Sequence, residues 1–346
     1  MKIGNCTVGT GACCFIIAEA GVNHNGDISL ARKLIDVARE AGADAVKFQT
    51  FKADNVVTKS AAKARYQKET TGAAESQFEM IKGLELTAKD FAALSVHARK
   101  KGIIFLSSPF DKLSVDLLDG LGVPAFKIPS GEITNFPLLK HIARKKKPLI
   151  LSTGMSTLGE IEEALEVIRK ERVEEIILLH CVSCYPAAIG DVNLKAMDTL
   201  RYAFGLPVGL SDHTVGITVP VAAVARGACV IEKHFTLDKD LPGPDHRVSL
   251  AADELKELVS VIRDVEKALG DGMKIPGVEE EENKKVARRS LVARIDIPEG
   301  AIISEEMLDI KRPGAGIEPK YIGIIAGRKA KKDIKSGELV TFAKVV

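Results

Sequence analysis

The stretch that decides the fold reads Gly209-Leu210-Ser211-Asp212-His213-Thr214, then a Val- and Ala-rich run over residues 215–227, then Cys229-Val230-Ile231-Glu232-Lys233-His234. We interpret it as a strand, a crossover helix and a second strand, with His213 and His234 at the two strand ends. Such strands run parallel, and neighbouring strands lie roughly 5 Å apart. Two imidazoles at equivalent strand ends can bind one ion, so His213 and His234 form a candidate metal site.

A simpler interpretation exists for each histidine, because a single histidine at a strand end is as often a cap as a metal ligand. The occurrence of both at consecutive strand ends favours the metal site. Glu232 lies two residues before His234 and shares its face of the strand. We therefore expect Glu232 to orient the His234 ring.

The same alternation of strand and helix extends over the first 270 residues. Eight short β-like runs separated by helical runs predict a parallel sheet, and eight units in about 255 residues predict a closed (β/α)8 barrel. A doubly wound open sheet is the competing fold, but no G-x-G-x-x-G follows the first strand. The predicted strands are Phe15–Glu19, Ala45–Gln49, Ile103–Ser107, Ala125–Ile128, Leu149–Ser152, Ile176–His180, Val208–Ser211 and Val230–His234; the clearest helical runs are Ser29–Ala41, Ala88–Lys101, Leu158–Lys170 and Ala252–Leu269.

Polar side chains collect where the predicted strands end, which is the face that carries the chemistry in barrel enzymes. Lys47 and Lys127 lie on separate strands, and two ammonium groups with hydroxyls nearby suit a phosphate or a carboxylate. Each lysine alone would more often be a surface charge. The other residues of this set include Glu19, Gln49, Ser107, Ser108, Ser130, Glu132, Ser152, Ser183 and Tyr185.

Two irregular segments extend these strand ends. The polar segment 52–87 is long for a loop and is predicted to cover a substrate. The Pro- and Gly-rich segment 238–247 follows the eighth strand and is predicted to hold a fixed path. Asp245 within it is a candidate acceptor for substrate hydroxyls.

The composition of the 346 residues, with 5% aromatic residues and no Trp, suits aliphatic α/β layers. A net charge of +2 argues against nucleic acid as the main partner. No run of 18 uncharged apolar residues and no signal-peptide pattern occur, so we expect no membrane association and a cytoplasmic location. The six cysteines are expected to be free thiols, because Cys181-x-x-Cys184 lacks the second pair that a zinc site normally has.

The composition changes after Leu269. Residues 279–287 combine glutamates with two lysines and are predicted to be a solvated linker between a barrel domain, 1–278, and a small domain, 288–346. The small domain repeats the pattern D-I-x-x-G-x-Φ-Φ, where Φ is aliphatic, at 296–303 and 333–340. Two such units predict a compact β domain that packs against the barrel or another subunit.

Seven short motifs occur in order along the chain: E-A-G-V-N-H-N-G at 19–26, K-F-Q at 47–49, K-I-P-S-G-E at 127–132, S-T-G-M at 152–155, G-L-S-D-H-T at 209–214, E-K-H-F-T at 232–236 and R-P-G at 312–314. Together they closely resemble the sialic acid synthase (N-acetylneuraminate synthase) family over essentially the whole chain. Residues 288–346 resemble the antifreeze-like (SAF, β-clip) domain of that family. The resemblance implies a (β/α)8 TIM barrel followed by a small β-rich SAF domain.

The resemblance implies a transferase that condenses phosphoenolpyruvate with N-acetylmannosamine, or a related aldose, to a nine-carbon 2-keto sugar acid and releases phosphate. His213 and His234 would hold Mn²⁺ or Mg²⁺, which polarises the aldehyde oxygen, and Glu19 would be the acid/base group. The residues implied to bind phosphoenolpyruvate are Lys47, Ser108, Lys127, Ser130, Ser152, Ser183 and Ser211, and those implied to contact the sugar are Gln49, Glu132, Tyr185, Asp245 and Arg312.

The resemblance also implies a domain-exchanged homodimer in which Arg312 reaches the sugar of a partner barrel. The sugar stays open, because Ser108 and Ser183 stand where some members have Thr and Asn. Besides N-acetylmannosamine and its 6-phosphate, a diacetamido-deoxyhexose would make the chain a legionaminic acid-type synthase. A Schiff-base pyruvate aldolase using Lys127 or Lys233 is a further alternative. A non-catalytic sugar- or ice-binding protein is the last, but it would not need Glu19 together with the two histidines.

Overall fold

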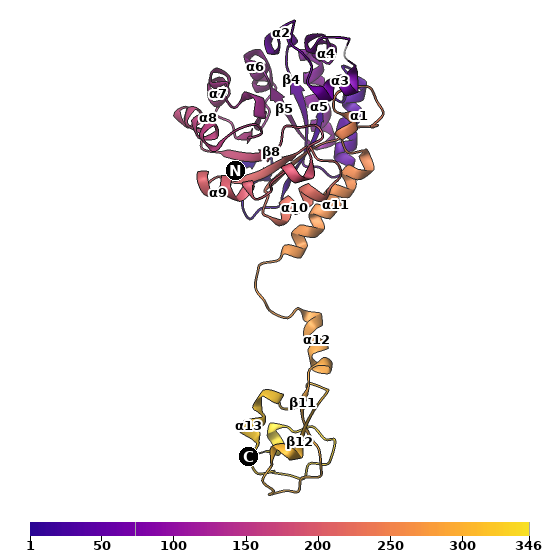
Figure 1. Cartoon of the computed structure of the whole chain (residues 1–346), viewed down its shortest axis with the longest axis vertical. Coiled ribbons are helices and arrows are strands. Elements are labelled where there is room, and N and C mark those ends of the chain that lie inside the picture. Colours follow the sequence, from indigo (N-terminus) through magenta and orange to yellow (C-terminus); the bar gives the residue numbers. More distant parts are fainter. Residues whose placement is uncertain (73, 346) are drawn as a thin grey trace. The chain divides into compact units, whose positions relative to one another are not determined.

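The computed structural model describes residues 1–72 and 74–345 and contains the eight parallel strands expected from the sequence. They pair in the order β5-β4-β3-β10-β9-β8-β7-β6, and β5 lies beside β6, so the sheet forms a nearly closed barrel (Figure 1). Each strand begins and ends within two residues of its predicted bounds, and the barrel is confirmed. The strands are β3 (Phe15–Gly21), β4 (Ala45–Thr50), β5 (Ile104–Pro109), β6 (Phe126–Ile128), β7 (Leu149–Ser152), β8 (Ile176–Cys181), β9 (Val208–Asp212) and β10 (Val230–His234).

A helix follows each strand on the outside of the barrel (Figure 1). Helix α5 (Ala88–Lys101) shows the local causes: Thr87 and Asp90 cap each other's backbone N–H groups at its start, and Gly102, with a φ of 71°, ends it. Its buried residues recur at helical spacing and pack against the sheet. The other seven are α1 (Ile28–Glu40), α6 (Lys112–Gly120), α7 (Phe136–Ala143), α8 (Leu158–Lys170), α9 (Ala196–Phe204), α10 (Thr218–Ala225) and α11 (Ala252–Leu269).

A small hairpin that the sequence did not predict closes the N-terminal end of the barrel. Strands β1 (Lys2–Ile3) and β2 (Cys6–Thr7) pair antiparallel. The buried side chains of Ile3 and Val8 pack into the barrel interior with the first residues of several strands, among them Phe15 and Val230. Two-residue strands carry too little periodicity to be recognised, which is why sequence patterns missed them.

Contacts divide the described chain into two compact units, Met1–Gly270 and Asp271–Val346. In the second unit, β11 (Ser290–Ala293) pairs antiparallel with β12 (Leu308–Lys311), and α13 (Ile322–Ile325) contributes to a separate hydrophobic core. Residues 279–287, expected as a linker, lie in helix α12 (Val278–Ala287), and the carbonyl of Lys285 accepts a hydrogen bond from Gly314. The domain boundaries expected from the sequence, 1–278 and 288–346, remain predictions.

The two copies of the D-I-x-x-G repeat pair with each other in this second unit. Ile297 and Ile334 exchange both backbone hydrogen bonds at 2.8 Å. The Asp333 carboxylate accepts from the N–H of Glu299, and the Asp296 carboxylate accepts from the N–H of Ser336, each at 2.8 Å. These are equivalent positions of the two repeats, so the repeat seen in the sequence corresponds to a local twofold relation between two turns.

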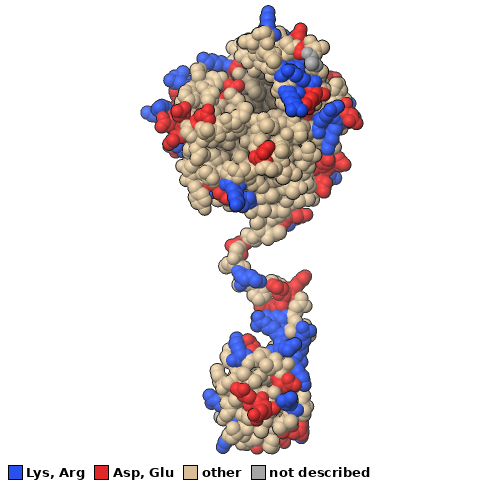
Figure 2. All heavy atoms as spheres, in the orientation of Figure 1, with Lys and Arg blue, Asp and Glu red and all other residues tan. Residues whose placement is uncertain are grey.

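The surface fits the balanced composition. On the visible face of the 1–270 unit, Lys and Arg are interspersed with Asp and Glu (Figure 2). None of the helices in the described part of the chain combines the length with the apolar character that a membrane crossing requires.

Candidate active site

A cavity of about 490 Å³ lies where the barrel strands end. Parallel strands place their carboxyl ends on one side of the barrel, so side chains far apart in sequence converge there. All of the predicted site residues except Glu132 and Arg312 line this cavity. They are Glu19, Lys47, Gln49, Ser108, Lys127, Ser130, Ser152, Ser183, Tyr185, Ser211, His213, His234 and Asp245.

Two lysines and two glutamates form the buried floor of the cavity. The Lys47 ammonium lies 2.8 Å from Glu19 Oε1 and 3.8 Å from Glu232 Oε2, and the Lys127 ammonium lies 3.2 Å from Glu232 Oε1. Lys47 also donates to Ser108 Oγ at 2.9 Å. None of these four ionisable side chains is more than 5% exposed, so each depends on the others for charge compensation.

The two glutamates differ in protonation because their surroundings differ. Burial raises the pKa of Glu19 to about 7, although the neighbouring Lys47 lowers it. Burial also acts on Glu232, but there Lys127 and Lys47 outweigh it and lower the pKa to about 2. Near neutral pH Glu232 is therefore ionised, while Glu19 exchanges a proton. When Glu19 is protonated, one of the two ammonium groups lacks a counter-carboxylate and can pair with an anionic ligand.

Several buried polar atoms of the cavity lack a hydrogen-bond partner among the described residues. They are Glu19 Oε2, Ser152 Oγ, Glu232 Oε2 and His234 Nδ1. Buried polar groups are nearly always hydrogen-bonded in native proteins. A polar ligand in the cavity would supply the missing partners.

The two strand-end histidines lie together in the cavity, with ring centroids 5.5 Å apart. His213 Nδ1 is 2.8 Å from the Val182 carbonyl oxygen, which can only accept, so we assign the proton to Nδ1 and a lone pair to Nε2. Metal-bound histidines typically donate their second nitrogen in this way. Burial, together with His213, lowers the pKa of His234 well below its usual range, and His234 Nδ1 is unpartnered.

These observations fit a divalent cation held by the two imidazoles. Burial disfavours the imidazolium form of His213, but Cys181 and the Val182 carbonyl raise its pKa, so metal binding would displace a proton there. No group of three or more His, Cys, Asp and Glu side chains within residues 1–72 and 74–345 has the geometry of a metal site. The ligands that the two strand-end histidines could offer a cation are two imidazole nitrogens.

A glycine makes room for the hydroxyls at the other side of the cavity. Gly154 donates its backbone N–H to Ser130 Oγ at 2.9 Å. A Cβ at this position would lie 2.3 Å from Ser183 Oγ, so no larger residue fits between the two serines.

The segment 52–87 covers the cavity, as expected for an insertion of this length. It carries three short helices, α2 (Ala53–Val56), α3 (Arg65–Thr71) and α4 (Gln77–Gly83). Tyr66 stacks on Tyr185 with centroids 5.1 Å apart, and Tyr185 packs on His213 at 4.1 Å. The cavity residues from this segment, which sequence reasoning missed, are Val56, Ala64, Tyr66, Gln67, Gln77, Met80, Ile81 and Leu84.

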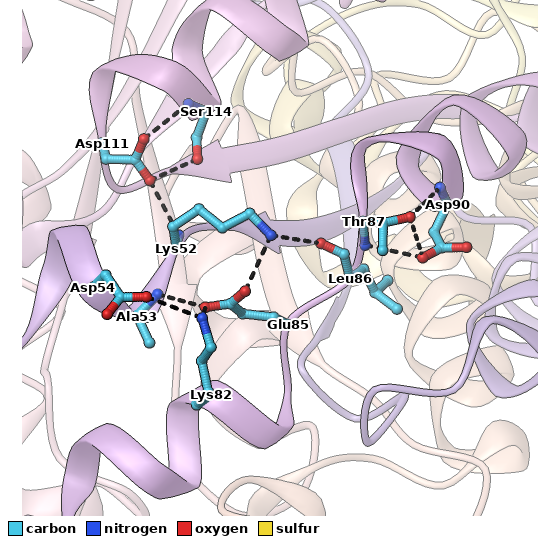
Figure 3. Close-up of polar contacts among 10 residues, drawn as sticks. All are labelled: Lys52, Ala53, Asp54, Lys82, Glu85, Leu86, Thr87, Asp90, Asp111 and Ser114. Carbon is cyan, nitrogen blue, oxygen red and sulfur yellow. Dashed lines mark hydrogen bonds and ion pairs between the residues drawn. The ribbon is translucent and has the colours of Figure 1, made fainter.

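Glu85 ties the two ends of this covering segment together (Figure 3). Its carboxylate accepts from Ala53 N at 2.7 Å, Lys52 Nζ at 3.0 Å and Lys82 Nζ at 3.1 Å. Asp111, at the start of α6, accepts from the backbone N–H of Lys52 and anchors the segment to the barrel. The covering segment is therefore fixed at its base by buried and half-buried carboxylates.

The family model for the NeuB family matches residues 34–274, and the model for the SAF domain matches residues 288–346. The chain belongs to the NeuB family. The resemblance inferred from the seven motifs is thus confirmed, and so is the barrel followed by a SAF domain.

Several relatives of this NeuB-family chain carry the names of sugar acid synthases. It is 55% identical to the N,N'-diacetyllegionaminic acid synthase of Campylobacter jejuni, over 94% of this chain and 98% of the relative. It is 52% identical to the protein of the same name from Legionella pneumophila, over 95% and 94%. A crystal structure of N-acetylneuraminic acid (sialic acid) synthetase from Leptospira borgpetersenii, in complex with citrate, is 38% identical with a TM-score of 0.72, over 82% of this chain and 94% of that one. The expectation of an enzyme is confirmed.

Two predicted sugar-contacting residues of the NeuB-family chain lie elsewhere. Glu132 ends a 3₁₀ turn, Ser130–Glu132, and accepts a hydrogen bond from Asn135 Nδ2 at 2.7 Å, outside the cavity lining. Arg312 lies in the second compact unit. The roles of both residues remain predictions.

The expected role of Glu232 is corrected by the structure. It shares the inner face of β10 with His234, as the spacing of two predicts. However, its carboxylate accepts from Ser211 Oγ at 2.9 Å and pairs with the two lysines instead of orienting the His234 ring. Because Glu232 lies one pleat deeper in this NeuB-family barrel, it reaches Lys47 on β4 and Lys127 on β6 through the barrel interior.

Lys233 does not fit the role of a Schiff-base nucleophile. Its ammonium is buried, pairs with the Asp212 carboxylate and donates to the Thr214 carbonyl, away from the cavity lining. It joins the end of β9 to β10 and is a structural residue. The cysteines are free, as expected: Cys181 is buried beside His213 and Cys184 is exposed.

Proposed function

We propose that this chain condenses phosphoenolpyruvate with a diacetamido-deoxyhexose, releases phosphate and forms a nine-carbon 2-keto acid of the legionaminic type. Identities of 55% and 52% to the two N,N'-diacetyllegionaminic acid synthases, against 38% to a sialic acid synthetase, support this sugar over N-acetylmannosamine. Of the sugars that the family resemblance implies, the diacetamido-deoxyhexose thus replaces N-acetylmannosamine as the proposed substrate. The observation that supports this class of reaction is the pair of buried ammonium groups, of Lys47 and Lys127, beside Glu19.

The floor suits the donor substrate. Phosphoenolpyruvate has a carboxylate and a phosphate, and Lys47 and Lys127 provide two ammonium groups on separate strands. Hydroxyls from neighbouring strands line the same cavity and can donate to the remaining anionic oxygens: Ser108, Ser130, Ser152, Ser183 and Ser211. Ser152 Oγ has no protein partner in the described chain and would gain one on binding.

Glu19 is placed to move a proton. The reaction forms a bond from C3 of phosphoenolpyruvate to the aldehyde carbon, and the aldehyde oxygen takes a proton to become a hydroxyl. Water adds at C2, and the bond between C2 and the phosphate oxygen then breaks, so that phosphate leaves and C2 becomes the keto carbon. A carboxylate with a pKa of about 7 can accept a proton from water and return it within one cycle. Glu19 Oε2 is unpartnered and lines the cavity, so it is free to contact that water.

His213 and His234 would hold the divalent cation, Mn²⁺ or Mg²⁺, that the family resemblance implies. Such a cation supplies Lewis-acid polarisation of the aldehyde oxygen. The imidazoles lie beside Tyr185 and Asp245, which we assign with Gln49 to binding of the sugar. Burial raises the pKa of Asp245 to about 6, so it is mostly ionised at neutral pH and can accept from sugar hydroxyls.

A panel of aldoses tests the proposal. Phosphate release is measured with phosphoenolpyruvate, Mn²⁺ or Mg²⁺, and one of three sugars: a diacetamido-deoxyhexose, N-acetylmannosamine or its 6-phosphate. The expected result is the highest kcat/KM for the diacetamido sugar. A higher kcat/KM for either N-acetylmannosamine form would contradict the assignment, and phosphate release with none of the three would contradict the reaction.

A further inference from the structure

The cavity has two chemically different ends. Lys47, Lys127 and Glu232 lie within the barrel strands and make one end charged. The covering segment makes the other end, where amides and apolar side chains replace charges: Val56, Gln67, Gln77, Met80, Ile81 and Leu84. An aldose that condenses with phosphoenolpyruvate must place its aldehyde at the charged end, so its distal carbons face the covering segment.

Gln67 is held in one orientation by its own segment. Its Oε1 accepts from Ala64 N at 2.9 Å and from Gln77 Nε2 at 3.4 Å. Its Nε2 points to Tyr66 Oη at 3.4 Å. The carbonyl side of this amide is therefore used within the protein, whereas the NH₂ group has two hydrogens and keeps one for a ligand in the cavity.

The neighbouring Tyr66 links Gln67 to the reacting centre. Tyr66 stacks on Tyr185, which packs against His213. The Glu85 clamp holds both ends of the segment in place (Figure 3). The Tyr66 stack and the Glu85 clamp thus hold the segment that carries the Gln67 amide, and this amide lines the cavity.

We propose that Gln67 is a specificity-determining residue that donates to the carbonyl of the acetamido group farther from the aldehyde. This inference rests on the proposed function. The apolar side chains of Met80 and Leu84 line the same end and suit the acetyl methyl and the deoxygenated carbon of a diacetamido-deoxyhexose. A sugar with a hydroxyl at that position has neither a carbonyl acceptor nor a methyl to bury there.

The test uses the Gln67→Glu variant in the full chain. Glutamate keeps the oxygen that caps Ala64 but replaces the donor NH₂ by an acceptor, which repels an acetamido carbonyl. We compare kcat/KM for a diacetamido-deoxyhexose with that for N-acetylmannosamine. The expected result is an about tenfold fall in this ratio, since one hydrogen bond is lost and an unpaired acceptor is left. The KM for phosphoenolpyruvate should stay within twofold.

Glu79→Gln is the matched control, because it makes the reverse change in α4 at an exposed capping position outside the cavity lining. It should leave the ratio unchanged. An unchanged ratio in Gln67→Glu, with a wild-type enzyme that prefers the diacetamido sugar, would overturn this inference alone. A wild-type enzyme that prefers N-acetylmannosamine would overturn the proposed function and this inference with it.

Discussion

Glu19 and Glu232 show at the scale of single residues how two identical side chains acquire different chemistry. Each is buried, but Glu232 pairs with two lysines and accepts from Ser211, whereas Glu19 pairs with one lysine, Lys47, and accepts a long hydrogen bond from Gln49. The pKa of Glu232 is about 2 and that of Glu19 is about 7. Surroundings that separate two carboxyl pKa values in this way commonly mark a fixed charge and an acid/base group.

Replacing Glu19 by Gln should preserve substrate binding and abolish proton transfer. We expect kcat to fall about 10²- to 10⁴-fold, the usual contribution of an acid/base group, with little change in the KM for phosphoenolpyruvate. Steady-state phosphate release measures both. Nearly full activity of Glu19→Gln would remove this residue from the proton-transfer role.

Glu19 also determines the direction in which activity and stability change with pH. The reaction needs the carboxylate as base, so kcat/KM should rise with pH and level off above the pKa of about 7. Because burial raises this pKa above the ordinary 4.5, the stability that Glu19 contributes is full below pH 4.5 and is lost as pH rises through about 7. Activity and unfolding free energy measured from pH 4 to 9 should both lose this feature in Glu19→Gln. If either pH profile of Glu19→Gln still changes slope near pH 7, another group causes that change.

The histidine pair predicts a loss of metal affinity on substitution. His213→Ala or His234→Ala should weaken Mn²⁺ binding by at least the roughly 10- to 100-fold that changes around metal ligands cost. Metal content and titration of Mn²⁺ into the purified variants measure this. His141→Ala is the control. His141 lies on the outer helix α7 and pairs with Asp116 of α6. Wild-type metal affinity in both cavity variants would contradict the assignment.

At the scale of elements, the covering segment differs from the barrel helices. Helix α3 buries none of its side chains fully, so its position depends on polar contacts and on the Tyr66 stack rather than on a hydrophobic face. At the base of the same segment, Glu85 makes three polar contacts, with Lys52, Ala53 and Lys82. The cover should therefore loosen without unfolding the barrel when this carboxylate is removed.

Glu85→Ala should raise the KM for the sugar roughly tenfold, because hydrogen bonds to a charged group contribute on the order of 1.5–3 kcal/mol and water replaces only part of that. It should also speed tryptic cleavage within residues 59–68. Kinetics and limited proteolysis measure the two effects. Glu69→Ala removes an exposed ion pair with Arg65 in the same segment and is the control. Equal cleavage rates in both variants would show that the clamp does not order the cover.

At the scale of the whole molecule, the two compact units have separate hydrophobic cores. Deleting the chain from Arg288 should leave the barrel folded and raise the sugar KM more than the KM for phosphoenolpyruvate, because Arg312 is expected to act on the sugar. Arg312→Ala in the full chain should reproduce most of the effect. Circular dichroism and kinetics with both substrates measure this. Equal changes in the two KM values would limit the second unit to a supporting role.

Sequence patterns were enough to predict the barrel, because eight short apolar runs alternate with helical runs and allow few other parallel arrangements. They also placed Lys47, Lys127, His213 and His234 in one site, since carboxyl ends of parallel strands must meet on one side. The D-I-x-x-G repeat likewise predicted two equivalent turns, although it did not predict that they pair with each other.

The partners of these side chains follow from three-dimensional packing and could not be predicted from the sequence. Lys47 could be assigned to a strand end from its pattern, but its pairing with Glu19, Glu232 and Ser108 depends on the depths of three strands. The terminal hairpin, the Glu85 clamp and the Gln67 amide had no periodic signal, because each is fixed by contacts between residues distant in sequence or by single hydrogen bonds. The periodicity of a sequence indicates which face of a helix or strand is buried, but it does not indicate which residues that face contacts.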